Sequence, residues 1–101
     1  MKTDNMIQLK SYAFALRTIK LYRYLCEDKK EFVLSKQILK SGTSIGANIE
    51  EAIGAQSNKD FLSKLSIAYK EARETHYWLR LLRDSDMLNE SEVIPILSDC
   101  E

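Results

Sequence analysis

Two glycines, Gly42 and Gly46, lie four residues apart inside a segment that its other residues predict to be helical. Each interior glycine destabilises a helix by about 1 kcal/mol relative to alanine. A helix that keeps both usually gains the close approach of a second helix, because glycine has no side chain to hold a neighbour away. The two glycines share one row with Glu50 and Gly54, so we expect tight packing along that row. Leucine at position 46 would overpack such a contact.

The composition is that of a helical protein. The 101 residues include only three glycines and one proline, and 45% are hydrophobic while 30% are charged. Residues that favour helices, such as Ala, Leu, Lys, Glu and Arg, dominate over β-branched residues. We therefore expect one all-α domain over residues 1–101.

Apolar residues recur at spacings of three and four in four segments, which predicts four helices. The first is expected over residues 5–27, the second over 35–55, and the third and fourth after Ser57 and Asn89. The expected N-caps are Thr3 or Asp4, Ser35, Ser57 and Asn89. Short connections predict an antiparallel up-down-up-down four-helix bundle with a short fourth helix. Such a helix covers only half of the groove, so either the natural chain continues or another subunit fills the gap.

The first and third helices carry more apolar residues than one buried face requires. In the first helix, one stripe consists of Leu9, Tyr12, Leu16, Ile19, Tyr22 and Cys26, and a second of Phe14, Leu21 and Leu25. The stripe of the second helix is Ile38, Ile45, Ile49 and Ala52. That of the third is Phe61, Leu65, Ala68, Ala72, Thr75, Leu79 and Leu82. Tyr77 and Trp78 lie outside it. We expect one face of each helix to be core and the remainder to meet a partner, with Tyr77 and Trp78 as a candidate interface.

Charge is distributed unevenly along the chain. The net charge is zero, but residues 1–49 carry +5 and residues 50–101 carry −5. A neutral total argues against a protein that coats nucleic acid. The first helix nevertheless carries four cations interleaved with tyrosines, namely Lys10, Arg17, Lys20 and Arg23. Lys10, Arg17 and Lys20 share one side of the helix, and Arg23 drifts away from it. This basic face is expected to contact phosphates, to be a solvated surface, or to meet the acidic helices of a neighbouring subunit.

Polar residues of the second and third helices are expected to face each other. Ser41, Ser44 and Asn48 follow one side of the second helix, and an antiparallel third helix would bring Glu71 and Glu74 opposite them. Buried carboxylates need hydrogen-bond donors, which hydroxyl and amide groups supply. The pattern favours a structural network that fixes helix register, with a ligand-binding or catalytic pair of carboxylates as the alternative.

Residues for catalysis are scarce. The single histidine, His76, is expected at a surface or an interface rather than as a proton shuttle. The sequence has no spacing typical of a zinc or di-iron site and no phosphate-binding glycine motif. Cys26 and Cys100 lack paired spacing and are expected to be free thiols. We expect a protein that is not an enzyme and uses no cofactor or metal.

The sequence also lacks a recognisable secretion signal, and no apolar run approaches the roughly 18 residues of a membrane span. We therefore expect a cytoplasmic protein without a membrane partner.

The order Ser44-Ile45, Asn48-Ile49 and Glu51 resembles the SI-x-x-NI-x-E signature of the bacterial four-helix-bundle family named after the 23S rRNA intervening sequence. The residues Asn58-Lys59-Asp60-Phe61, Ile67-Ala68, Glu74 and Leu79 look like the third-helix pattern of that family. The similarity spans about residues 7–90. Gly54 comes two positions later than the glycine of many members, and the fourth helix looks shorter than usual.

The resemblance implies a four-helix bundle that assembles into a ring, typically a homopentamer. Some members of the family are encoded inside rRNA intervening sequences. A related accessory protein of diversity-generating retroelements binds nucleic acid and a reverse transcriptase, although that relative is strongly basic and this chain is neutral. Most members have no assigned biochemical function. We therefore expect a ring-forming scaffold or adaptor that contacts RNA or an RNA-associated protein, the alternative being a module that binds proteins only.

Overall fold

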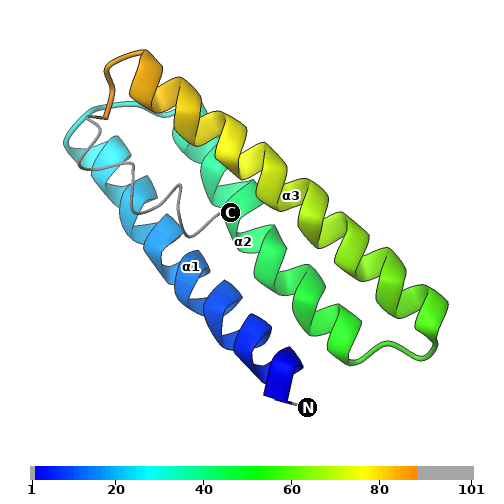
Figure 1. Ribbon diagram of the computed structural model, residues 1–101. Helices are drawn as coiled ribbons and strands as arrows, with labels where there is room; N and C mark the ends of the chain where they lie inside the picture. The colour runs from blue at the N-terminus through cyan, green and yellow to red at the C-terminus, as the bar shows by residue number, and fades with distance from the viewer. Residues whose placement is uncertain (1, 89–101) are drawn as a thin grey trace.

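Three helices make up the part of the chain that the structure, a computed structural model, describes: residues 2–88, with side-chain surroundings described from residue 6 onward. They are α1 (Lys2–Glu27), α2 (Leu34–Ile53) and α3 (Asn58–Asp84), and consecutive helices run in opposite directions (Figure 1). No strand occurs among these residues, so the prediction of an all-α protein is confirmed. The predicted fourth helix, with its cap at Asn89, lies outside the described residues.

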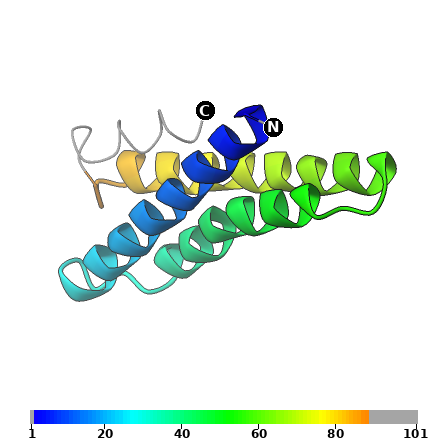
Figure 2. The same cartoon turned by 90° about the horizontal axis from the view of Figure 1, so that it is seen from below.

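The central helix is α2, which packs against α1 on one side and α3 on the other. Within residues 2–88, the backbones of α1 and α3 do not approach each other closely. Figure 2 shows α1 running at an angle to α3. The backbones of α1 and α3 are therefore positioned relative to each other mainly through the packing of each helix against α2.

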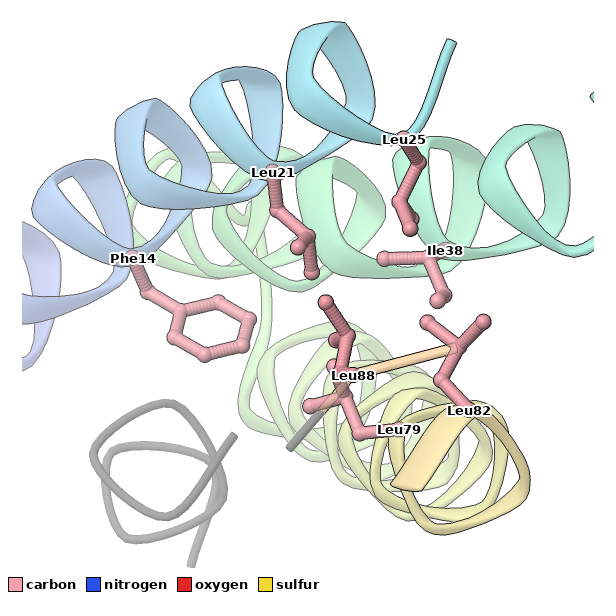
Figure 3. Packing of buried hydrophobic residues seen from close by; sticks show 7 residues of the cluster. All are labelled: Phe14, Leu21, Leu25, Ile38, Leu79, Leu82 and Leu88. Carbon is pink, nitrogen blue, oxygen red and sulfur yellow. The ribbon is translucent and has the colours of Figure 1, made fainter. Parts of the chain in front are cut away.

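A cluster of aliphatic side chains and one phenylalanine fills the space between the three helices. Its buried members are Phe14, Leu21, Leu25, Ile38, Leu79, Leu82 and Leu88 (Figure 3). The shorter of the two stripes predicted for α1 supplies its part of this core. In the longer stripe, Leu9, Tyr12 and Leu16 remain 72%, 64% and 51% exposed. The other three residues of that stripe, Ile19, Tyr22 and Cys26, are half-buried. The predicted surplus of apolar residues is thus present on α1, and its most exposed part is the first half of the longer stripe.

Where α1 and α2 approach most closely, their contact is made by small and polar residues. Gly42 lies against Thr18, and Gly46 lies against Ser11. A Cβ atom at Gly42 would come within 2.7 Å of Thr18 Cγ2 and 2.8 Å of its Oγ1. Thr18 is 1% exposed, and its hydroxyl donates to the Phe14 carbonyl at 2.8 Å. The close packing predicted from the glycine row is present at these two positions, and it is tighter at Gly42.

The start of α2 corrects the prediction of Ser35 as N-cap. The helix begins one residue before it, at Leu34, and a carboxylate from the preceding loop caps it. Glu31 Oε1 accepts from the backbone N–H groups of Val33 and Leu34 at 3.0 and 2.8 Å, and its Oε2 accepts from that of Ser35 at 2.7 Å. Ser35 is instead buried, where its hydroxyl donates to the Glu31 carbonyl and lies 3.7 Å from Cys26 Sγ.

The start of α3 agrees with the sequence. Ser57 has an extended backbone, and its hydroxyl accepts from the Asp60 N–H at 3.1 Å, as expected of an N-cap. An acidic residue in the first turn also interacts favourably with the helix dipole. This N-cap could be predicted from the sequence because the capping residue and the N–H donor are only three residues apart.

Hydroxyl groups make the buried polar contact between α2 and α3. Ser41 and Thr75, which are 2% and 0% exposed, hydrogen bond to each other at 2.8 Å. Thr75 Oγ1 also lies 2.8 Å from the carbonyl oxygen of Glu71, one turn earlier in its own helix. The pair is specific to one register of the two helices, because a shift along either axis would leave buried hydroxyls without partners.

We expect Gly42→Ala to be less stable than Gly46→Ala by roughly 1–3 kcal/mol, the usual range for overpacking. Both gain helix propensity, but only the new methyl group at position 42 collides with a buried side chain that is itself hydrogen bonded. Urea unfolding of the two variants measures the difference. In the Gly42→Ala background, Thr18→Ala should remove the collision and much of this penalty. Equal stability of the two glycine variants would contradict the assignment of Thr18 as the limiting contact.

We expect Thr75→Val to destabilise the fold by roughly 1–3 kcal/mol, because it leaves the Ser41 hydroxyl buried without its partner. The double variant Ser41→Ala/Thr75→Val should recover part of that loss, since both polar groups are then gone. A double-mutant cycle from thermal or urea unfolding gives the coupling. Strictly additive effects would show that the two hydroxyls do not act as a pair.

Candidate functional site

The predicted basic face of α1 winds around the helix. Lys10, Arg17, Lys20 and Arg23 are all exposed, but Lys10 and Arg23 point about 140° apart at about 100° per residue. Lys10 lines a small groove of about 170 Å³ whose walls include Ile7, Phe14, Ile45, Ile49 and Ala72. Lys20 and Arg23 lie farther round, on the outer surface of α1. The structure therefore does not place the four cations on one flat surface.

Exposed apolar side chains share that outer surface. Leu9, Tyr12 and Leu16, called here the α1 outer stripe, follow one another at helical spacing. Beside the stripe, a shallow groove of about 280 Å³ runs between α1 and α2 and is lined by Tyr12, Ala15, Thr43, Gly46 and Ala47, among others. The outer surface of α1 thus combines apolar area with the charges of Lys20 and Arg23. A surface of this kind is typical of an interaction site rather than of a solvated helix face.

A second surface lies along α3. Tyr69, Arg73, Tyr77 and Arg80 are all exposed and line one open groove of about 750 Å³. The guanidinium carbon of Arg73 lies 5.9 Å from the centroid of the Tyr69 ring, and that of Arg80 lies 5.8 Å from the Tyr77 ring. These distances are within the range of cation–π contacts. We call these four residues the α3 ladder.

The remaining polar groups around the ladder have their own contacts. His76 lines the groove and is half-buried, with Ala72 beside it. Glu74 also lines the groove, and its Oε1 accepts from the indole N–H of Trp78 at 3.3 Å. Asp84 accepts from Arg83 Nε at 2.9 Å, and this hydrogen bond lowers the pKa of the Asp84 carboxyl. Ionised Asp84 is therefore held by Arg83, beyond the last residue of the ladder.

The two aromatic residues of the predicted interface differ in exposure. Tyr77 is 48% exposed, whereas Trp78 is half-buried and packs against the hydrophobic core. Their rings meet edge to face with centroids 5.2 Å apart. Tyr77 is therefore the more accessible member of the pair.

The polar residues predicted between α2 and α3 are only partly brought together. Ser41 bonds to Thr75, a residue that the sequence placed in the apolar stripe, rather than to a carboxylate. The hydroxyl of Ser44 donates to the Lys40 carbonyl, and the side-chain amide of Asn48 donates to the Ser44 carbonyl. Glu51 forms an ion pair with Lys64 at 3.4 Å. Glu74 accepts from the Trp78 indole through its carboxylate, whereas Glu71 contacts Thr75 through its backbone carbonyl.

The described residues contain no group of three or more His, Cys, Asp or Glu side chains placed to hold a metal ion. Cys26 is a free thiol, as expected, and Cys100 lies outside the described residues. None of the helices in residues 2–88 is both long and apolar enough to cross a membrane.

Comparison with known proteins places the chain in a family. A crystal structure at 1.70 Å of a protein of unknown function from the S23 ribosomal protein family of Bacteroides thetaiotaomicron VPI-5482 superposes with a TM-score of 0.96. The two chains are 53% identical, and the match covers 99% of this chain and 88% of the other. Comparison with curated proteins found no match. Residues 3–101 match the profile of the 23S rRNA-intervening sequence proteins, and the chain therefore belongs to the 23S rRNA-intervening sequence protein family.

Proposed function

We propose that this chain is a non-enzymatic scaffold or adaptor of the cytoplasm that assembles from several copies and contacts RNA or an RNA-associated protein. The observation that carries the proposal is the exposed α1 outer stripe next to the cations Lys20 and Arg23. A surface with both apolar area and positive charge suits macromolecular partners better than a small-molecule substrate.

Self-association is supported by the extent of apolar exposure. Three large apolar residues, Leu9, Tyr12 and Leu16, lie more than half exposed on consecutive turns of one helix. Isolated exposed apolar residues are common, but a continuous stripe usually marks an interface. Burying such area stabilises an assembly by about 25 cal/mol per Å². A closed ring, and a pentamer in particular, is what the family resemblance implies, and we propose the same for this chain.

We also propose that each subunit is an antiparallel four-helix bundle. The groove lined by Phe14, Ile45 and Ile49 is apolar and lies between α1 and the other two helices. Residues 89–101, for which the sequence predicts a capped fourth helix, are the segment proposed to cover part of it.

Contact with RNA is supported by the exposed cations of α1. Lys and Arg side chains bind phosphates largely through charge, so binding weakens as salt rises. The name of the family refers to an rRNA intervening sequence, which makes ribosomal RNA a reasonable first probe. A neutral chain such as this one gains more positive potential at the RNA when several copies present their cations together.

We expect the purified protein to have a molar mass of several chains, near five if the ring forms, and Leu9→Glu/Leu16→Glu to reduce it to that of one chain. The charges would be buried without partners in the assembly, whereas both positions are exposed in the single subunit. Size-exclusion chromatography with light scattering measures the mass, and circular dichroism confirms that helix content is kept. Leu62→Glu, at a leucine 63% exposed on α3, is the matched control. A monomeric parent, or an unchanged mass in the double variant, would rule out this interface.

We expect Lys20→Glu/Arg23→Glu to weaken binding to a labelled 23S rRNA fragment and to flatten its salt dependence. Removing one phosphate-binding cation reduces the slope of log K against log salt by about 0.9 for duplex and about 0.7 for single strands. Fluorescence anisotropy at several salt concentrations gives the slope. Lys36→Glu/Lys40→Glu makes the same charge change on exposed positions of α2. RNA binding that is absent in the parent, or equally weakened in both variants, would contradict the role of α1.

The second candidate function is a module that binds proteins only. The exposure of Tyr77 at the surface of α3 favours it. Its signature would be association with a protein that is insensitive to salt and abolished in Tyr77→Ala. Trp78→Ala is a less specific probe, because Trp78 also packs against the core.

A further inference from the structure

We propose that the α3 ladder, Tyr69, Arg73, Tyr77 and Arg80, binds unpaired nucleic-acid strands by stacking on bases and pairing with phosphates. The proposal concerns a different helix from the basic face of α1, and it requires neither those cations nor assembly into a ring. It starts from the order of the four residues, in which aromatic and guanidinium groups alternate on one face of the helix.

The geometry of the ladder suits a strand that runs along α3. Tyr69 and Tyr77 are eight residues apart, which is about 12 Å along the axis, and Arg73 and Arg80 are about 10.5 Å apart. Both distances exceed the rise of one nucleotide, about 3.4 Å in a stacked strand, so each tyrosine is available to a different base. The groove of about 750 Å³ beside them is open and follows the helix.

The chemistry of the ladder favours unpaired strands over duplexes. Tyr69 is 66% and Tyr77 48% exposed, so part of each ring is accessible to a base. Such stacking is possible only where the bases are not already stacked within a duplex. The two arginines lie over the tyrosine rings, 5.9 and 5.8 Å from the centroids, which places their charges beside the stacking positions.

Electrostatic complementarity supports an anionic ligand. The ladder itself contains two cations and no acid. Of the nearby carboxylates, Glu74 accepts from the indole of Trp78 and Asp84 accepts from Arg83. The charge of Arg80 also helps to lower the pKa of Asp84, so an anionic ligand would compete with Asp84 for that arginine. An acidic peptide would satisfy the two arginines but would leave the two tyrosine rings without a planar partner, so nucleic acid fits the whole surface better.

The test measures the affinity of the full-length protein for a labelled single-stranded oligouridine by anisotropy, with an RNA duplex of equal length as competitor. Tyr69→Ala and Tyr77→Ala should each weaken binding by roughly 5- to 150-fold, the effect expected for one stacked base. Tyr69→Phe and Tyr77→Phe keep the ring and should bind almost as the parent does. Arg73→Ala/Arg80→Ala should lower the salt slope by about 0.7 for each phosphate released, whereas Lys36→Ala/Lys40→Ala, which removes the same charge from α2, should not.

Several outcomes would overturn the inference. They are a duplex that competes as well as the single strand, polyglutamate that competes equally, or alanine variants that bind as tightly as the parent. A change in molar mass on light scattering of the alanine variants would instead make this face an interface between copies. If Lys20→Glu/Arg23→Glu abolishes RNA binding while every ladder variant binds normally, the ladder fails and the α1 proposal stands. If the ladder variants bind RNA more weakly while the α1 variant binds normally, the ladder proposal stands and the α1 proposal fails.

Discussion

The contact of Gly42 with Thr18 is the constraint on which the arrangement of the three helices depends. At this point the side chain of α1 touches the backbone of α2, with no room for even one further carbon atom. Because the backbones of α1 and α3 do not approach each other closely within the described residues, the α1–α2 contact sets the position of the α1 backbone, while side chains of α1 and α3 meet in the core. It turns Phe14, Leu21 and Leu25 toward the core, and it thereby turns the α1 outer stripe and Arg23 away from it.

The hydroxyl pair of Ser41 and Thr75 fixes the register of α3 on α2, as the contact of Gly42 with Thr18 fixes the position of α1. Both contacts use small residues, and both are buried. Small side chains contribute little hydrophobic free energy, so these contacts specify geometry while the leucines and Ile38 supply the burial. A division of this kind allows the outer surfaces to vary without changing the way the helices pack.

Much of this fold was predictable from the sequence, because its strongest signals are local. The Ser57 cap lies within one turn of its donor, and the glycine row repeats every four residues. The Glu31 cap was missed because the carboxylate reaches forward from the loop, while Ser35, the expected cap, is buried beside Cys26. Spacing alone also could not decide which stripe of α1 is core, since the longer stripe is the one outside the buried cluster, with Leu9, Tyr12 and Leu16 exposed. Thr75 was assigned to the apolar stripe because a threonine at a core position gives no sign of its partner on another helix.

The sequence was enough to predict which residues share a helix face, but not which of those faces are exposed to solvent. The sequence showed that four cations follow α1, and helical spacing places Tyr69, Arg73 and Arg80 on the broad face that carries His76. Whether those faces meet solvent depends on the side of each helix that α2 covers, which is a tertiary property. In the structure, Lys10 lines a groove whereas Arg23 is exposed on the outer surface of α1, so the predicted cations lie in two different environments.

The central position of α2 has a consequence for the order in which this protein gains its structure. Both close backbone pairings, α1 with α2 and α2 with α3, join helices that are neighbours in the chain. Closing short loops costs little chain entropy, and helical domains of such low contact order fold within microseconds to milliseconds. Each of these two helix pairings can therefore form without waiting for a distant part of the chain to fold.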